Sequence, residues 1–381
     1  MKYLVWLQAV LRAGSNKALP ILSHFGTAKA VYNARNTALR QMNILSDGEM
    51  DRAENLSIAF AENVLSLCKK NGIKIVCYYD DNYPNALRNI VNPPLVLYIK
   101  GELPDFNTEP SVCIVGPRKV TEFGKKSAYS LAARLSKSGI IVISGGAKGA
   151  DTAAHVGALK VNGKTVAILP CGIMNDYLKD NARLRELIAK KGCLISEYTP
   201  NFPVTKASFR VRNRLLAALG DTTIIVEAAE KSGALITAGY ACEYGRELFV
   251  IPGNPTMPEY KGSNALLRDG VHPLLDAGDI FREYISVYGD KIDIEKAYKK
   301  EKSETEPVKS KKAQKIQKNL PSGLSKTAQM LYNSLNKQKF SADDLLGFKI
   351  SDDELIAAIT ELEMEHLIKA CAGGFYEKIE L

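Results

Sequence analysis

Two glycine-rich turns that each carry a cation are the segments of this sequence best suited to bind a polyanion. Arg118 closes a turn that follows the apolar run 112–115, and Lys148 lies in the segment 144–151, directly after a second apolar run. Short β-branched runs that end in glycine and lead into a helix are typical of a parallel α/β sheet. Their turns present backbone N–H groups and a helix N-terminus to an anion, above all phosphate. We therefore predict a polyanion site at one edge of such a sheet.

Neither turn matches the common nucleotide-binding loops. A P-loop would continue into Gly-Lys-Ser or Gly-Lys-Thr, and a dinucleotide-binding turn would show G-x-G-x-x-G with an acidic residue about twenty positions later. The sequence has neither pattern at these turns. Each turn taken alone would be interpreted as a tight connection between a strand and a helix. Because both carry a cation and follow successive strands, we favour a ligand site over a purely structural role.

Residues 209–214 form a further cationic segment. They contain Phe209, three arginines and Asn213, and no acidic residue follows before Gly220. Arginine binds phosphate through two parallel hydrogen bonds and stacks on bases, and a neighbouring aromatic ring offers another stacking surface. A solvated helix start is the alternative, but such starts usually include carboxylates. The composition of this segment therefore favours contact with nucleic acid.

Two polar helix starts each permit a structural and a functional interpretation. Ser232 and Gly233 open a helix and would serve equally well as a cap or as an anion cradle. Asp151 and His155 lie four residues apart, so a carboxylate–imidazole pair could form on one helix face. A helix cap at Asp151 with a packed histidine explains the same spacing better. Since no serine or cysteine has an evident base partner, we expect a binding protein and not an enzyme.

The composition is that of a globular protein, with 46% hydrophobic and 24% charged residues in 381 positions, so a sizeable core is expected. No apolar run reaches the length of about 18 residues that a membrane span requires, and we expect no membrane association. The seven cysteines are scattered without C-x-x-C spacing, and the four histidines are equally dispersed. We therefore expect reduced thiols in a cytoplasmic protein, with no metal site and no cofactor.

Apolar runs and helical patterns divide the chain into parts. Strand–helix alternation from about 110 to 285 predicts an α/β fold with a Rossmann-like, doubly wound and mostly parallel sheet, extended at one edge by strands at 73–78 and 95–99. Residues 299–318 contain eight lysines against three glutamates and supply much of the net charge of +9, which is typical of a solvated linker. Helical patterns at 325–338, 342–346 and 352–365 and a short hairpin at 368–379 follow, which together give the outline of a winged helix. The predicted domains are 1–70 (helical), 71–288 (Rossmann-like core), 289–322 (basic linker) and 323–381 (winged-helix-like).

Taken in their order along the chain, these segments resemble the DNA-processing protein A family (DprA, also called Smf). The resemblance is carried by the two cationic turns, the arginine-rich segment and several later blocks. The matching blocks are residues 115–124, 144–155, 171–172, 195–198, 209–214, 227–237, 250–255 and 261–267, with weaker ones at 81–87 and 93–98. The helical start looks like the SAM-like domain of the family, and the tail looks like its optional winged helix.

The resemblance implies a protein that binds single-stranded DNA, protects incoming DNA during natural transformation and loads the RecA recombinase. It also implies a homodimer formed through the Rossmann-like domain. Arg118, Lys148 and the block 212–214 would then be the chief contacts to the strand, and the turn at 144–146 would hold a backbone phosphate. With the residues singled out above, the predicted single-strand site comprises Gly116, Arg118, Ser144, Gly145, Gly146, Lys148, Gly149, Phe209, Arg212, Asn213, Arg214, Ser232 and Gly233.

The main alternative is an enzyme. Nucleoside-monophosphate phosphoribohydrolases have a similar Rossmann-like sheet, but they carry P-G-G-x-G-T-x-x-E on a strand-to-helix turn. At the comparable place this chain has residues 230–237, which lack the glycine pair and the following glutamate. Release of free adenine from AMP would distinguish such a hydrolase from a binding protein.

Overall fold

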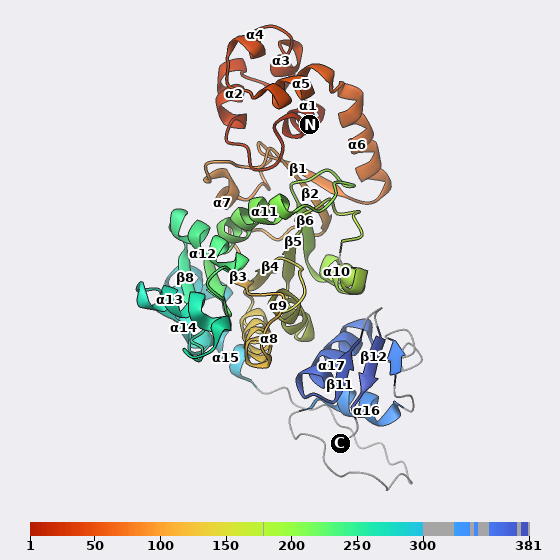
Figure 1. Ribbon diagram of the computed structural model, residues 1–381, viewed down its shortest axis with the longest axis vertical. Helices are drawn as coiled ribbons and strands as arrows, with labels where there is room; N and C mark the ends of the chain where they lie inside the picture. Colours follow the sequence, from red (N-terminus) through yellow and green to blue (C-terminus); the bar gives the residue numbers. More distant parts are fainter. Residues whose placement is uncertain (178, 300–323, 336–338, 342–349, 372–374, 380–381) are drawn as a thin grey trace.

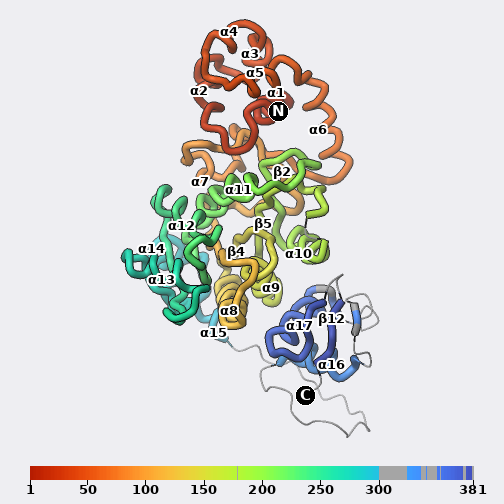
Figure 2. Tube along the Cα trace, in the orientation of Figure 1, coloured from red at the N-terminus to blue at the C-terminus, as the bar shows by residue number. Residues whose placement is uncertain are grey.

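The computed structural model describes residues 1–177, 179–299, 324–335, 339–341, 350–371 and 375–379. Six helices come first and pack together at one end of the molecule (Figures 1 and 2). Trp6 is fully buried among them, with its ring 5.0 Å from that of Tyr32 and its Nε1 donating to the carbonyl of Leu56 at 2.7 Å. This N-terminal unit consists of α1 (Lys2–Leu11), α2 (Ala18–Phe25), α3 (Ala28–Asn33), α4 (Ala38–Gln41), α5 (Asp47–Asn55) and α6 (Ile58–Lys70).

A nine-stranded sheet forms the centre of the molecule (Figure 1). Its strands lie in the order β1-β2-β6-β5-β4-β3-β7-β8-β9. The pairs β1–β2 and β2–β6 are antiparallel, and all pairs from β6 to β9 are parallel. The predicted Rossmann-like sheet and its two edge strands are therefore confirmed. The strands are β1 (Lys74–Cys77), β2 (Val96–Gly101), β3 (Ser111–Val115), β4 (Ile141–Ser144), β5 (Thr165–Ile168), β6 (Cys193–Ser196), β7 (Thr222–Ile225), β8 (Glu247–Val250) and β9 (His272–Pro273).

Helices cover both faces of the sheet, which is why its central strands are apolar along their whole length. Val112 and Ile114 of β3 pack with α8, α9 and α14, whereas Cys113 and Val115 pack with α11 and α12 on the opposite face. None of the helices in the described ranges is long and apolar enough to cross a membrane. The helices of this core are α7 (Asn85–Arg88), α8 (Glu122–Lys137), α9 (Ala150–Lys160), η1 (Lys179–Asn181), α10 (Ala182–Lys191), α11 (Lys206–Leu219), α12 (Gly233–Glu243), η2 (Pro258–Tyr260), α13 (Lys261–Arg268), α14 (Ala277–Tyr288), η3 (Gly289–Lys291) and α15 (Ile294–Tyr298).

The first residues of the predicted basic linker, 289–298, belong structurally to the core. They form η3 and α15, and Ala297 is buried in the same apolar cluster as Leu135 of α8. Ile292 and Ile294 pack against this cluster as well. These apolar residues, and not the lysines that follow them, decide where the core ends. Most of the lysine-rich stretch lies outside the described residues.

A separate apolar cluster holds the C-terminal unit, residues 324–335, 339–341, 350–371 and 375–379, together. Its three strands lie in the order β10-β12-β11 and are all antiparallel. The helix predicted at 342–346 falls outside the described residues, so the winged helix stays a prediction. The elements of this unit are α16 (Lys326–Ser334), β10 (Lys339–Ser341), α17 (Asp352–Met364), β11 (Ile368–Ala370) and β12 (Phe375–Lys378).

His155 is packed inside the core, as its structural interpretation predicted. It is fully buried on α9, and its Nδ1 lies 2.8 Å from the hydroxyl of Thr165. The N-cap of α9 is Gly149 and not Asp151, which lies in the first turn. Burial and, to a smaller extent, the nearby Arg212 guanidinium together lower the pKa of His155 to about 3.

Acid should destabilise the protein partly through His155. Between pH 6.5 and about 3 the unfolded imidazole is protonated while the buried one stays neutral, so the unfolded state binds more protons and stability falls as pH falls. At pH 5 this term amounts to about 2 kcal/mol. We expect His155→Gln to lose less melting temperature than the parent chain between pH 7 and pH 5. If both proteins lose the same melting temperature between pH 7 and pH 5, His155 does not contribute this loss of stability.

Candidate functional site

The site lies where the order of the strands reverses. From β3 the chain proceeds through β4, β5 and β6 on one side, and then returns to β7, β8 and β9 on the other. Open α/β sheets bind ligands at the carboxyl ends of the strands beside such a reversal. A cavity of about 350 Å³ lies at this point. Its lining consists of Val115, Gly116, Pro117, Arg118, Ala147, Asp151, Phe209, Arg212, Asn213, Leu216, Ser232, Gly233, Ala234 and Thr237.

The two glycine turns predicted to share a site are in direct contact. The amide of Ala150 donates to the carbonyl of Pro117 at 3.2 Å. Gly149 has φ +86°, and a Cβ there would lie 2.4 Å from the Pro117 oxygen and 2.5 Å from the Arg118 oxygen. Only glycine tolerates both this backbone conformation and so close an approach. The contact fixes the position of Arg118 relative to the start of α9.

An exposed cation lies over an aromatic ring at the mouth of the cavity. The guanidinium of Arg118 is 4.5 Å from the ring centroid of Phe209, and Tyr177 meets that ring edge-on at 5.6 Å. A cation over a ring face is attracted by the ring quadrupole. Arg118 is exposed and Phe209 is half-buried, so both remain accessible from outside. Together they place an accessible charge over one face of an aromatic ring.

The start of α12 supplies the opposite wall. Ser232 caps this helix, with its hydroxyl accepting from the amide of Ala234 at 3.3 Å. Asn213 of α11 donates from Nδ2 to the carbonyl of Gly233 at 3.2 Å. The structure therefore supports the capping role of Ser232, while the same helix N-terminus faces the cavity and favours an anion there.

Arg212 forms the floor of the cavity but is almost fully buried. It donates to the carbonyls of Gly145, at 2.7 Å, and of Ile168. A Cβ at position 145 would lie 2.5 Å from Asp151 Oδ2 and 2.6 Å from Arg212 Nη1, so glycine is needed between these two side chains. Burial raises the pKa of Asp151, and the Arg212 guanidinium opposes this shift. Arg212 thus holds the turn after β4 in place from α11.

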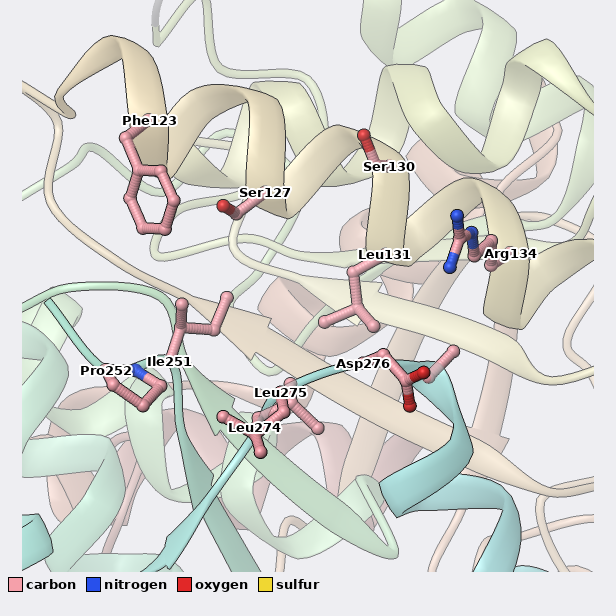
Figure 3. A pocket seen from close by; sticks show the side chains of 11 residues that line it. Phe123, Ser127, Ser130, Leu131, Arg134, Ile251, Pro252, Leu274, Leu275 and Asp276 are labelled. Carbon is pink, nitrogen blue, oxygen red and sulfur yellow. The ribbon is translucent and has the colours of Figure 1, made fainter.

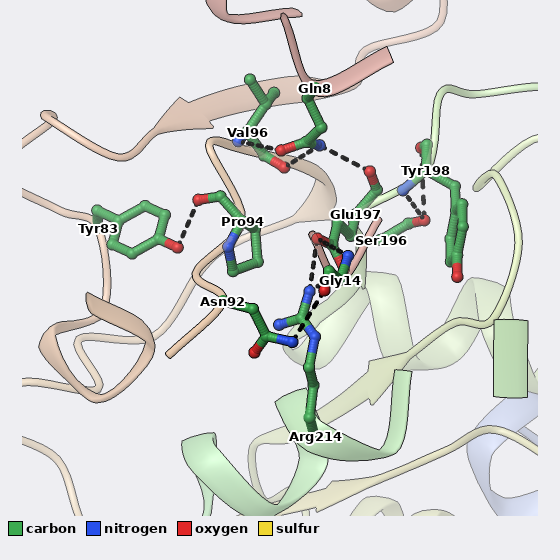
Figure 4. Close-up of polar contacts among 10 residues, drawn as sticks. All are labelled: Gln8, Gly14, Tyr83, Asn92, Pro94, Val96, Ser196, Glu197, Tyr198 and Arg214. Atoms are coloured by element: carbon green, nitrogen blue, oxygen red, sulfur yellow. Dashed lines mark hydrogen bonds and ion pairs between the residues drawn. The ribbon is translucent and has the colours of Figure 1, made fainter. Parts of the chain in front are cut away.

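Arg214 lies in the interior and makes a structural ion pair. Its side chain is 1% exposed, and its Nη2 donates to both carboxylate oxygens of Glu197 at 2.6 and 2.5 Å (Figure 4). Glu197 also accepts from the amide of Gly14, in the N-terminal unit, at 3.1 Å. In this conformation Arg214 is inaccessible to a DNA strand, so we leave it out of the binding surface proposed below.

The same network joins the N-terminal unit to the edge of the sheet. Gln8 of α1 donates to the carbonyls of Val96, at 2.8 Å, and Glu197, at 2.7 Å (Figure 4). Its amide oxygen accepts from the amide of Val96 at 2.7 Å. Through Glu197 and Arg214, the first helix of the chain is thereby connected to α11, which carries Phe209 and the cavity floor.

The remaining predicted residues lie behind or beside the cavity. Ser144 is buried and donates to the carbonyl of Ile114 at 2.7 Å, and Gly146 adopts φ +66° in the turn after β4. Lys148 is half exposed and forms an ion pair with Asp180 at 2.5 Å. The cavity brings together Gly116, Arg118, Phe209, Arg212, Asn213, Ser232 and Gly233. Its lining does not include Ser144, Gly145, Gly146, Lys148, Gly149 or Arg214.

Two surface cations near Phe209 were not among the predicted site residues. Lys206 and Arg210 are both exposed and lie one helical turn apart on α11, next to Phe209. Their spacing of four residues was the signal that places them on one face. Tyr177 is a further missed neighbour of the ring, and nothing in its local sequence indicates this.

A second cavity, of about 370 Å³, lies between α8 and the segments that follow β8 and β9 (Figure 3). Phe123 of α8 and Leu275 are its most exposed apolar members, at 56% and 80%. Arg134 is the only lysine or arginine among the residues that line it. This lining is less suited to phosphate than that of the cavity at the reversal point.

Comparison with known proteins agrees with this geometry. The sequence profile of the family described as DNA recombination-mediator protein A matches residues 74–285, which include all nine strands of the sheet. This chain belongs to the DNA recombination-mediator protein A family. Among its members, DNA processing protein DprA of Bacillus subtilis is 34% identical over 220 residues, covering 58% of this chain and 74% of that protein. Protein Smf of Synechocystis is 38% identical over 204 residues, covering 53% of this chain and 51% of that protein.

Solved structures of the family show the same fold. The X-ray structure of DprA from Streptococcus pneumoniae superposes with a TM-score of 0.65 at 29% identity, covering 74% of this chain and 98% of the other. DNA processing protein A from Helicobacter pylori, described for its single-stranded DNA binding mode, has a TM-score of 0.52 at 33% identity and covers 57% of this chain and 97% of the other. The resemblance derived from the motifs is therefore confirmed, together with the recombination-mediator family.

Replacing Arg214 and Arg118 separately should distinguish the structural arginine from the accessible one. Arg214→Met leaves the buried Glu197 carboxylate unpaired, which costs about 3–5 kcal/mol in such sites. Arg118→Met removes an exposed side chain and should change stability by no more than about 0.5 kcal/mol. Thermal unfolding of both variants measures this difference. Equal, small shifts in melting temperature would mean that the Glu197–Arg214 pair does not hold the core as described.

Proposed function

We propose that this chain binds single-stranded DNA at the cavity between the carboxyl ends of β3, β4 and β7. The observation that carries this proposal is the exposed Arg118 guanidinium stacked on the ring of Phe209 at 4.5 Å, at the mouth of that cavity. A charge beside a flat aromatic surface matches a phosphate beside a base. Proteins that bind single strands without sequence preference combine these two elements.

The walls of the cavity favour a backbone phosphate near α12. The start of α9 already has a carboxylate beside it, because Asp151 lies in its first turn and accepts from the amide of Ala147 at 3.2 Å. The N-terminus of α12 has Ser232 and Gly233 in the lining and no carboxylate in its first turn. Uncompensated helix N-termini attract anions. We therefore infer that the phosphate binds between Arg118 and the start of α12.

Stacking explains why the strand should be single. Phe209 can receive a base face only if that base is free of its partner, because paired bases in a duplex are stacked on their neighbours. The exposed Lys206 and Arg210 continue the positive surface along α11 on the outer side of Phe209. Such a row of cations suits several successive phosphates and gives little sequence preference.

The family supports a proposal for the role in the cell. We infer that the chain protects incoming single-stranded DNA during natural transformation, loads the RecA recombinase and works as a homodimer in the cytoplasm. A recombination-mediator family and a relative described for single-strand binding support this inference. Assembly of RecA on strands already coated by single-strand-binding protein tests it. Faster assembly is expected, and no effect would leave only a DNA-binding protein.

The hydrolase alternative receives less support from the site. Glu227, which lies between β7 and residues 230–237, does not line the cavity. It is fully buried and accepts from the amide of Thr121 at 2.7 Å and from its hydroxyl at 2.8 Å. Its carboxylate thus holds Thr121, the N-cap residue of α8.

Two substitutions should separate the contribution of charge from that of stacking to the affinity for a single strand. Arg118→Met removes one phosphate contact, so affinity for an oligo-dT strand should fall and the slope of log K against log salt should become shallower by about 0.7. Phe209→Leu removes stacking worth about 1–3 kcal/mol per base and should lower affinity with an unchanged slope. Fluorescence anisotropy over a salt series measures both quantities.

Lys29→Met, which removes an exposed cation of the N-terminal unit, is the matched control and should bind as the parent chain does. A duplex of the same length should bind more weakly than the single strand. If both site variants bind like the control, the single-strand site lies elsewhere on the molecule.

A further inference from the structure

The C-terminal unit is docked on the core through its helix α17. This helix lies against α9 and α8 (Figures 1 and 2). Ala357 of α17 is buried in the same apolar cluster as Val156 and Leu159 of α9, and Ile356 packs against that cluster. The docking contact therefore has an apolar centre formed by one face of each helix.

Three ion pairs surround this apolar centre. Each pair joins a lysine of the core to a glutamate that lies in α17 or directly after it. The pairs are Lys160–Glu361 at 3.2 Å, Lys125–Glu363 at 3.5 Å and Lys126–Glu365 at 2.9 Å. The lysine side chains are 22%, 18% and 44% exposed, in the same order. We call Lys125, Lys126 and Lys160 the lysine triad.

The charge of α17 is opposite to that of a helix that enters a DNA groove. Its sequence, residues 352–364, contains five acidic residues and no lysine or arginine. Helices that bind DNA need cations to approach the phosphates of the backbone. Acidic side chains on the docked face would be repelled by those phosphates and are complementary to the lysine triad. The charge of α17 thus identifies it as a helix that contacts protein.

The lysine triad is itself suited to phosphate when α17 is absent. Lys125 and Lys126 lie in the first turns of α8, whose N-cap Thr121 follows Arg118 by three residues. They lie seven and eight residues after Arg118, on the helix that leads away from the proposed single-strand site. Ion pairs that are partly exposed are weak and are screened by salt, so a polyanion can compete for the lysines.

We propose that α17 is an electrostatic latch: the C-terminal unit covers the lysine triad in the free protein, and the backbone of single-stranded DNA displaces it. The proposal rests on the proposed single-strand binding. In the latched state the lysines pair with Glu361, Glu363 and Glu365. In the DNA-bound state the same lysines pair with phosphates, and the C-terminal unit is released from α8 and α9.

Zero-length carbodiimide cross-linking of the full chain tests the latch directly, because the reagent joins a lysine to a carboxylate only where they touch. Peptide mass spectrometry should find Lys126 joined to Glu365 and Lys160 joined to Glu361 in the free protein at low salt. A saturating oligo-dT strand should abolish both links. Links that persist at saturation, with binding verified by anisotropy, would overturn the latch and leave the proposed function intact. Intact links and no binding at all would overturn both.

The double variant Glu363→Gln/Glu365→Gln frees Lys125 and Lys126 from their ion pairs without adding positive side chains to the helix. We expect its affinity for oligo-dT to rise about tenfold at low salt, with a salt slope steeper by about 1.4, or 0.7 for each freed lysine. Glu283→Gln/Glu377→Gln removes two exposed carboxylates that form no ion pair with the lysine triad, and it is the control for net charge. An equal gain in the control would overturn the latch, since net charge alone would then explain the effect.

Discussion

The close approach of Gly149 to the carbonyl groups of Pro117 and Arg118 is the constraint on which the site depends. It brings the turn after β3 into contact with the turn before α9, at a backbone conformation that only glycine adopts without strain. The pairing of β3 with both β4 and β7 puts these turns beside the start of α12. Each part of the cavity thus follows from the strand order and from one tight backbone contact.

Helix α11 connects this constraint to the rest of the molecule. It presents Phe209 to the cavity mouth, and farther along the helix the buried side chains of Arg212 and Arg214 bind the turn after β4 and Glu197, respectively. Because Glu197 also accepts from Gly14, the N-terminal helices help to fix the rotation of α11. Removing one partner of such a buried pair is costly, because it leaves the other charge uncompensated.

The sequence predicted the sheet, its edge strands and the two turns because short β-branched runs ending in glycine leave few alternatives. It could not tell which of the arginines in residues 209–214 are exposed and which are buried. Arg210 is exposed, whereas Arg212 and Arg214 are buried by partners as distant in sequence as Gly145 and Glu197. Nor could it show that residues 289–298 pack on the core, since Ala297 is buried by contacts with segments distant in sequence.

Photo-cross-linking of a 4-thiothymidine-substituted oligonucleotide to the full chain, followed by peptide mass spectrometry, tests the position of the single-strand site most directly. The proposed site predicts cross-links in the segments 115–118 and 209–213, which meet at the cavity mouth. It also predicts that Phe209→Leu weakens the second set. Cross-links confined to the C-terminal unit or to the N-terminal helices would contradict the proposed site.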